Sequence, residues 1–295
     1  MIKQLDETQL KNRMNSRVRN NRIWKFIFLL STLFGLVVLA ILMIRVVMDG
    51  MTFLDMDFLT GRLSTDPDRA GIMGALIGTV WVMLVVIPVT LIVGVGTAIY
   101  LELYAKKGKF KSFIETNISN LAGVPSIVYG LLGLTVFVRL MEFGNVVLAG
   151  GFTLSLLVLP ILIVSAQEAL RAVPGHLAEA SYGMGATKWQ TIRRVILPAA
   201  LPSILTGSIL SLSRAIGETA PLTVLGIPAL LIPFPEGLFD TFTALPMQIY
   251  YWTLDSSLVA EYANLAAATI IVLLALLFLL NSVAIFIRSK FQHRY

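Results

Sequence analysis

Between two long apolar stretches, the chain from Pro174 to Pro198 reads PGHLAEASYGMGATKWQTIRRVILP. Proline suits the first turn of a helix, because its missing N–H would be unpaired there in any case, so a short helix is predicted to begin at Pro174. Thr187 and Gln190 have the spacing of a capping box, which predicts that a second helix begins there. That helix is predicted to end at Pro198, because a residue that precedes a proline is disfavoured in the α conformation. We call this segment the 174–198 loop.

The two short helices of the 174–198 loop are separated by glycines. At Gly185 the turn is expected to require a positive φ, which side chains disfavour. In the second helix one apolar face is predicted, made of Trp189, Ile192, Val195 and Ile196. The 174–198 loop is thus predicted to be a helix, a turn and a second helix that join two apolar spans.

The composition indicates a membrane protein with lipid as a partner. Of the 295 residues, 57% are hydrophobic and only 14% are charged, and the mean hydropathy is +0.82. A soluble protein of this size would carry more charge on its surface. The chain has no cysteine, and His176 and His293 lie far apart, so neither a disulfide nor a metal site is predicted. We interpret the net charge of +6 as a topological signal and predict no nucleic-acid partner.

Six apolar segments are long enough to cross a bilayer, at about 1.5 Å per residue and a hydrocarbon core of about 30 Å. They are expected at residues 24–44, 72–104, 121–141, 146–165, 201–225 and 263–286. The predicted fold is therefore an all-α polytopic membrane protein with six transmembrane helices, and its transmembrane domain is residues 24–287.

The charges between the spans predict the orientation of the chain. Lys and Arg are concentrated in the basic tail 1–23, in the short tail 288–295 and in the 174–198 loop. Residues 48–70 and 226–260 are instead rich in acidic side chains. Because cytoplasmic loops carry the excess of Lys and Arg, both termini and the 174–198 loop are expected to be cytoplasmic.

A charge pair lies inside the fifth expected span. Arg214 is about 20 Å from the inner boundary at 1.5 Å per residue, and an arginine at the centre of a span costs about 2.5–3.5 kcal/mol. Glu218 follows one helical turn later, so the two charges can meet. Two interpretations stay open. Either the pair neutralises itself within the bundle, or Arg214 lines an anion pathway and Glu218 holds it in position. Ser213 and Thr219, beside the pair, are further candidates for the anion pathway.

The third expected span carries Gly123, Pro125 and Ser126. Irregular backbone at membrane depth is tolerated only where it is buried in protein or lines a cavity. These residues are therefore candidates for a gate or for close helix packing.

The sequence lacks the motifs of several kinds of enzyme. It contains no phosphate-binding G-x-x-x-x-G-K-[ST], no H-E-x-x-H and no G-x-S-x-G. We predict no catalytic residue and no cofactor bound by this chain.

The 174–198 loop resembles the EAA loop of bacterial ABC-importer permeases. The matching residues, at the family's spacing, are Glu179, Ala180, Gly185, Leu197 and Pro198. Ser181 replaces the second alanine of the pattern and Val195 replaces an isoleucine. The resemblance implies that these five residues couple the chain to an ATPase.

Two further stretches resemble the phosphate-importer permeases of the PstA type. They are Ser213–Pro221, which reads SRAIGETAP, and Asn120–Gly130, which reads NLAGVPSIVYG. The resemblance implies one permease subunit of a phosphate importer in the inner membrane of a bacterial cell. It also implies a PstC-like partner permease, two copies of a cytoplasmic ATPase that hold ATP and Mg, and an external phosphate-binding protein.

Other functions are weighed against this one. A permease for another oxyanion, such as sulfate or molybdate, would share every feature above. An anion channel could also use Arg214, but it has no need of a coupling loop. A membrane enzyme is disfavoured, because the chain lacks a constellation of reactive groups at one depth.

Overall fold

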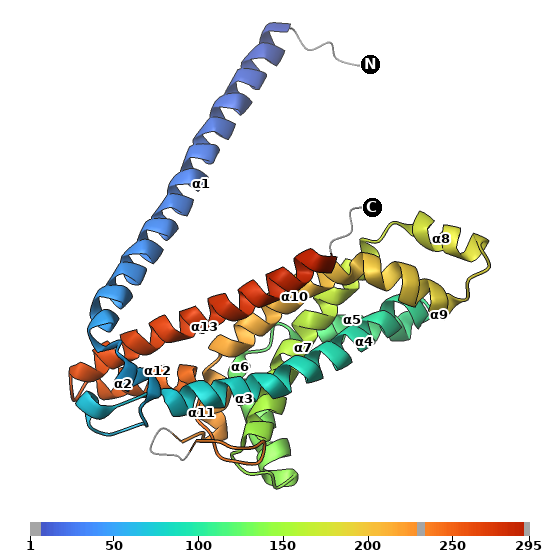
Figure 1. Cartoon of the computed structure of the whole chain (residues 1–295). Helices are drawn as coiled ribbons and strands as arrows, with labels where there is room; N and C mark the ends of the chain where they lie inside the picture. Colours follow the sequence, from blue (N-terminus) through green and yellow to red (C-terminus); the bar gives the residue numbers. More distant parts are fainter. Residues whose placement is uncertain (1–6, 229–233, 292–295) are drawn as a thin grey trace. The chain divides into compact units, whose positions relative to one another are not determined.

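The structure, a computed structural model, describes residues 7–228 and 234–291 and is almost wholly helical (Figure 1). Within these residues it has no β-strand, only an isolated bridge between Val146 and Thr241. The first helices are α1 (Glu7–Gly50), α2 (Met56–Thr60), α3 (Met73–Thr90), α4 (Gly96–Ile99), α5 (Lys109–Leu121) and α6 (Ser126–Gly133). The later helices are α7 (Val147–Arg171), α8 (Gly175–Gly183), α9 (Lys188–Thr191), α10 (Leu197–Gly217), α11 (Ala220–Leu225), α12 (Leu245–Asp255) and α13 (Glu261–Phe291).

The described residues also form short 3-10 turns and π-helical segments. The 3-10 turns are η1 (Met51–Phe53) and η2 (Pro67–Arg69). The π-helical segments are η3 (Leu91–Val95), η4 (Tyr100–Tyr104), η5 (Leu134–Leu140) and η6 (Ile192–Ile196). Because η3, α4 and η4 follow α3 without a gap, the second expected span is one continuous helical run from Met73 to Tyr104.

The predicted all-α polytopic fold is confirmed. Among the described residues, five helices are long and apolar enough to cross a membrane, and they lie within Arg17–Phe53, Met73–Tyr104, Val147–Arg171, Lys188–Gly217 and Glu261–Lys290. The sixth candidate is a bent pair, Lys109–Leu121 with Ser126–Leu140, whose two arms meet at 102°. The number of spans is six if this pair is counted as one.

The chain divides into two units, of which the first, Met1–Asp49, consists largely of α1. The expected first span, residues 24–44, lies within this helix. The helix has 44 residues and is therefore about 66 Å long at 1.5 Å per residue. That is about twice the thickness of a hydrocarbon core, so a large part of α1 lies outside it. Much of the basic segment 1–23 is helical, and its residues 1–6 lie outside the described residues.

Prolines explain the two interruptions in the expected spans. A proline inside a helix cannot donate to the carbonyl four residues back, and its ring clashes with that carbonyl. The residue four before Pro125 is Leu121, where α5 ends, and the residue four before Pro221 is Gly217, where α10 ends. The spans expected at 121–141 and 201–225 are therefore each broken.

The helix that begins at Lys188 does not end at Pro198, so that prediction was wrong. α9, η6 and α10 form one continuous run to Gly217. In η6 the turn is widened, and the Leu197 N–H donates to the carbonyl of Ile192, five residues back. Pro198 is the second residue of α10, directly after this π-helical turn. The wider turn relieves the clash that the proline ring would make in a regular α-helix.

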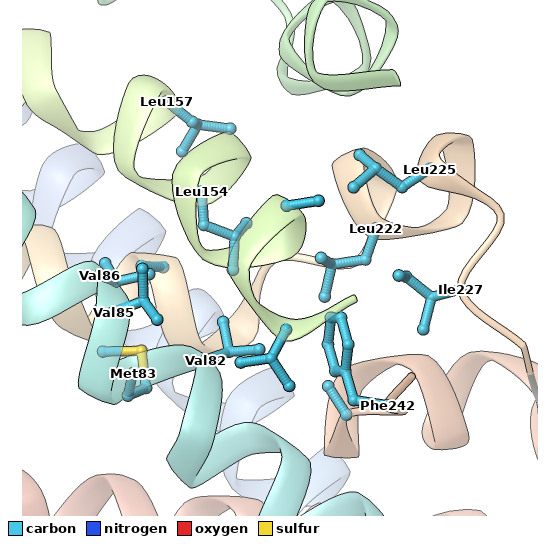
Figure 2. Close-up of a cluster of buried hydrophobic side chains, with 14 of the residues drawn as sticks. Val82, Met83, Val85, Val86, Leu154, Leu157, Leu222, Leu225, Ile227 and Phe242 are labelled. Atoms are coloured by element: carbon cyan, nitrogen blue, oxygen red, sulfur yellow. The ribbon is translucent and has the colours of Figure 1, made fainter. Parts of the chain in front are cut away.

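The largest group of buried apolar side chains lies where α3, α7 and α11 meet the segment before α12 (Figure 2). Figure 2 shows Leu154 of α7, Leu222 of α11 and Phe242 close together, and all three are almost fully buried. In addition to α3, α7 packs against α6 and α10, so it is the central helix of the second unit. In a bilayer such close packing, rather than escape from water, holds helices together.

Within the segment 226–260, residues 229–233 lie outside the described residues, and the part that follows them is not only an irregular loop. It contains α12, whose Trp252 is only 2% exposed and packs beside the ring of Phe58 at 6.2 Å. Tyr251 donates a hydrogen bond from its Oη to the carbonyl of Ile227 at 3.1 Å. These aromatic side chains therefore pack inside the protein.

Candidate functional site

The turn of the 174–198 loop is built around Gly185. α8 has Pro174 as its N-cap residue and ends at Gly183. Gly185 then has a φ of +82°, as expected for a turn of this kind. Its N–H donates to the carbonyl of Tyr182 at 2.9 Å, and the Ala186 N–H donates to the carbonyl of Ser181 at 3.2 Å. The left-handed residue thus turns the chain and satisfies carbonyls at the end of α8.

The predicted capping box is present at the start of α9. The Thr187 N–H donates to Gln190 Oε1 at 2.8 Å, and the Gln190 N–H donates to Thr187 Oγ1 at 3.4 Å. A second contact joins the two helices, because Ser181 Oγ and Thr191 Oγ1 lie 2.9 Å apart. Ser181 stands where the EAA pattern has its second alanine, and an alanine could not form this bond.

The apolar face predicted for the second helix is only partly correct. Ile192 and Ile196 are buried, but Trp189 is 57% exposed and Thr191 is buried in its place. Ile192 and Ile196 pack with Ala166 and Leu170 of α7. The 174–198 loop is thus fixed to the bundle through α9 and η6, and Figure 1 shows α8 extending beyond the ends of α7 and α10.

Five charged side chains form a group at the base of the 174–198 loop, which we call the Arg171 cluster. Its members are Glu102 of η4, Lys111 and Glu115 of α5, and Glu168 and Arg171 of α7. Arg171 lies at the centre. It donates from Nε to Glu102 at 3.0 Å, from Nη2 to Glu115 at 3.2 Å and from Nη1 to Glu168 at 3.0 Å. The last residue of α7 is therefore tied both to η4 and to α5.

A second link to η4 comes from the other side of the 174–198 loop. The Nζ of Lys188 lies 4.6 Å from the centre of the Tyr104 ring, a cation–π contact. Since Glu102 and Tyr104 both belong to η4, Arg171, which precedes the 174–198 loop, and Lys188, which lies within it, contact the same short segment. This arrangement is not predicted from the sequence, because the contacting residues lie far apart in it.

Arg214 and Glu218 meet, as expected from their spacing. The Arg214 Nε donates to Glu218 Oε1 at 3.0 Å. Glu218 is not in the helix, however, because α10 ends at Gly217 and Glu218 has an extended backbone. The Arg214 side chain is 48% exposed and the Glu218 side chain 16%. Among the described residues, the two Nη atoms of Arg214 form no hydrogen bond, so the outer edge of the guanidinium is available to a ligand.

Ser213 and Thr219, which lie beside the charge pair in the sequence, have hydrogen-bond partners outside the pair. Ser213 donates from Oγ to Asn281 Oδ1 of α13 at 2.8 Å. Thr219 is the N-cap residue of α11 without a side-chain cap bond, and its carbonyl accepts from Thr223 Oγ1 at 3.0 Å. The structure therefore brings together Arg214 and Glu218, but it directs the Ser213 hydroxyl toward α13.

The candidate gate residues lie at the break between α5 and α6. Gly123 and Pro125 are exposed, and Ser126 is the first residue of α6. A side chain at Gly123 would meet only the carbonyl of Asn120, at 3.4 Å. The Leu121 carbonyl accepts from the Val124 N–H at 3.0 Å and also from Tyr129 Oη at 2.8 Å. The bond from Tyr129 holds the end of α5 against α6.

The close packing that was expected near Gly123 occurs instead at Gly130. A Cβ on Gly130 would lie 2.8 Å from the Pro221 Cα and 2.9 Å from the Val224 Cβ. A glycine is therefore required here for α6 to approach α11. Because α11 begins directly after Glu218 and Thr219, this contact connects the gate candidates with the end of α10.

Comparisons with known proteins agree with these features. Residues 91–293 match the family model described as the binding-protein-dependent transport system inner membrane component. The phosphate transport system permease protein PstA of Mycobacterium leprae (strain TN) is 36% identical over 269 residues, which are 88% of this chain and 86% of that protein. The probable ABC transporter permease protein YqgI of Bacillus subtilis (strain 168) is 34% identical over 177 residues, and the chain spans only 60% of its length.

The fold is also found in solved structures. A chain in the crystal structure of a bacterial alginate ABC transporter, in complex with an alginate pentasaccharide-bound periplasmic protein, superposes with a TM-score of 0.61. The match covers 92% of this chain and 96% of that chain at 15% identity, so it concerns the fold alone. The family match covers more than half of the sequence, and it confirms the resemblance found in the 174–198 loop. The chain therefore belongs to the family of binding-protein-dependent transport system inner membrane components, the permeases of ABC transporters.

Proposed function

We propose that this chain is a permease subunit of an ABC importer that moves inorganic phosphate into the cytoplasm. The observation that carries the proposal is the 36% identity to a phosphate transport system permease over most of both chains. Its partners are a PstC-like permease, two copies of an ATPase that holds ATP and Mg, and an external phosphate-binding protein. ATP hydrolysis takes place on the ATPase and not on this chain.

In this proposal the 174–198 loop docks on the ATPase. Glu179 and Ala180 are exposed on α8. Tyr182, Met184 and Trp189 expose 45%, 89% and 57% of their surface. Large apolar side chains so exposed at one place are typical of a protein interface. Gly185 supports the docking conformation by its positive φ, whereas Leu197 and Pro198 begin α10, directly after η6.

The contacts described above also suggest how the motion passes into the membrane. A movement of the 174–198 loop would reach η4 and α5 through the Arg171 cluster and through Lys188. α5 is joined to α6 at the break that holds Gly123, Pro125 and Ser126. α6 packs against α11 at Gly130, and α11 follows Glu218. The loop and the charge pair are thus connected by contiguous packed elements, as a two-state coupling requires.

Arg214 is the residue that we propose to contact the anion. Phosphate is a tetrahedral oxyanion, and a guanidinium can donate two parallel hydrogen bonds to it. Glu218 uses only the Nε of Arg214 and so fixes the orientation of the side chain without occupying its Nη atoms. Since half of Arg214 is exposed on this chain, the pathway lies between this chain and the partner permease. Ser213 and Thr219 have a lesser role, at most in shaping the backbone of this region.

The proposed orientation places both termini and the 174–198 loop in the cytoplasm, because Lys and Arg are concentrated there. Arg288, near the end of α13, donates to Thr206 Oγ1 in the first half of α10 at 3.0 Å. α13 therefore ends on the side of the bundle where α10 begins, which is the side of the 174–198 loop. This contact supports a common side for the loop and the C-terminal tail.

The function is tested with the purified complex in lipid nanodiscs. ATP hydrolysis is measured with the binding protein and one anion at a time. We expect phosphate to stimulate hydrolysis and sulfate and molybdate to have no effect. If sulfate or molybdate stimulates hydrolysis and phosphate does not, that anion and not phosphate is the substrate of the importer. Anion flux through proteoliposomes in the absence of ATP would instead support a channel and contradict the importer.

A further inference from the structure

A basic and aromatic surface lies at the start of α5, and the proposed function makes no use of it. It consists of Tyr100, Lys106, Lys107, Lys109, Phe110 and Phe113, which we call the Lys106 surface. All six residues are exposed, and the exposed fractions of Tyr100, Phe110 and Phe113 are 61%, 77% and 66%. Large aromatic side chains of this kind are costly to leave in water.

The position of the Lys106 surface is fixed by the end of a membrane span. The apolar run Met73–Tyr104 stops two residues before Lys106. α5 then meets the α6–η5 arm at 102°. If that arm runs along the membrane normal, α5 lies nearly parallel to the membrane plane. The surface is therefore at the boundary between hydrocarbon and water, where amphipathic helices with Lys and Phe side chains bind.

The lysines of this surface are unpaired, unlike their neighbour Lys111. Lys111 turns toward Glu102 at 3.9 Å and Glu115 at 3.6 Å, and its side chain is only 14% exposed. In the described part of the chain, Lys106, Lys107 and Lys109 form no ion pair. They line an open hollow of about 570 Å³ together with Tyr100 and Phe110. Three unpaired ammonium groups beside a hollow attract an anion.

We propose that the Lys106 surface binds the headgroup of an anionic phospholipid, on the side of the membrane where the 174–198 loop lies. The lysines contact the phosphodiester, while Phe110 and Phe113 enter the boundary of the acyl chains. A lipid fits better than a protein because the charges and the aromatic rings lie directly at the end of a span. The bound lipid would hold the start of α5 in place, and α5 carries two members of the Arg171 cluster.

The test uses a fluorophore beside the surface. Ser112 is exposed on α5, and the sequence has no cysteine, so Ser112→Cys gives one label on this subunit. The labelled chain is assembled with its partner subunits in phosphatidylcholine nanodiscs. Brominated phosphatidylglycerol or brominated phosphatidylcholine is then added as a quencher. We expect phosphatidylglycerol to quench at the lower mole fraction, and high salt to weaken this preference.

Two matched triple variants distinguish the effect of the lysine charges from an effect on folding. A lysine near an anionic surface contributes about five-fold to binding, so three contribute up to about 100-fold. Changing Lys106, Lys107 and Lys109 together to glutamine should abolish this preference, and changing them to arginine should retain it. Co-purification with the partner subunits shows that each variant assembles. The proposal is overturned if both lipids quench equally in the unsubstituted chain, or if the glutamine variant keeps the preference. It is also overturned if that variant loses the ATPase subunit while its quenching is unchanged, because the surface would then serve the ATPase.

Discussion

The variant Gly185→Ala tests whether the turn of the 174–198 loop is needed for coupling to the ATPase. Gly185 has a φ of +82°, and a Cβ placed on it would have no atom within 4 Å. The alanine would therefore be strained by its backbone conformation and not by a clash. The left-handed conformation costs an L-residue about 1–2 kcal/mol. This energy lowers the population of the native turn by at most about 5- to 30-fold.

Gly183 offers a matched control two residues earlier. It also has open space around a Cβ, but it lies in α8 and its φ is not positive. An alanine there gains helix propensity, by at most about 1 kcal/mol. Gly183→Ala should therefore leave the loop intact. Gly185→Asn should lie between the two, because asparagine tolerates the left-handed conformation better than alanine does.

The assay titrates the ATPase subunit against the permease and measures ATP hydrolysis stimulated by the anion-loaded binding protein. We expect Gly185→Ala to raise the half-saturating ATPase concentration by up to about 5- to 30-fold. Gly183→Ala should titrate like the unsubstituted chain. Equal titrations for the two alanine variants would refute the role of the turn.

Three further predictions concern packing and topology. Gly130→Val should overpack against α11, lower the free energy of unfolding by about 1–3 kcal/mol and lower the thermal stability of the purified complex. Gly123→Ala should leave the thermal stability unchanged. Ser181→Ala should remove the hydrogen bond to Thr191, destabilise the 174–198 loop by about 1 kcal/mol and speed its proteolysis. A proteolysis rate equal to that of the unsubstituted chain would show that the bond is not needed. In intact cells, Met184→Cys and Ser289→Cys should resist an impermeant thiol reagent, whereas Ser257→Cys should react with it. The reverse labelling pattern would contradict the proposed orientation.

The sequence predicts best what depends on neighbouring residues. The apolar runs locate the helices that can cross a membrane. The Thr187 and Gln190 spacing predicts a capping box, and Gly185 predicts a left-handed turn. Arg214 and Glu218 meet because they are four positions apart in the sequence, a spacing that brings side chains together even at the end of a helix.

Contacts between distant segments are harder to predict. The Arg171 cluster joins residues that are up to 69 positions apart. Only its pairs within one helix, such as Lys111 with Glu115 four residues later, follow a local pattern. Prolines give a mixed signal. Pro125 and Pro221 break the helix four residues before them. Pro198 follows a π-helical turn without a break, and Pro88 of α3 and Pro160 of α7 lie inside unbroken helices. Whether a helix bends or widens at a proline depends on the packing around it.

The role of Arg214 is tested most directly by comparing phosphate uptake with assembly in three variants. Arg214→Lys keeps the charge but loses the two parallel hydrogen bonds. A hydrogen bond to a charged group contributes about 1.5–3 kcal/mol, so uptake should fall about 10- to 150-fold while the complex still co-purifies. Arg214→Gln alone strands the Glu218 charge and should weaken assembly.

The double variant Arg214→Gln with Glu218→Gln removes both charges together, so the largely buried Glu218 carboxylate is not left without its partner. If Arg214 contacts the anion, the double variant should assemble normally and remain unable to take up phosphate. Near-normal uptake by the fully assembled double variant would contradict the account, because Arg214 would then serve only to neutralise Glu218.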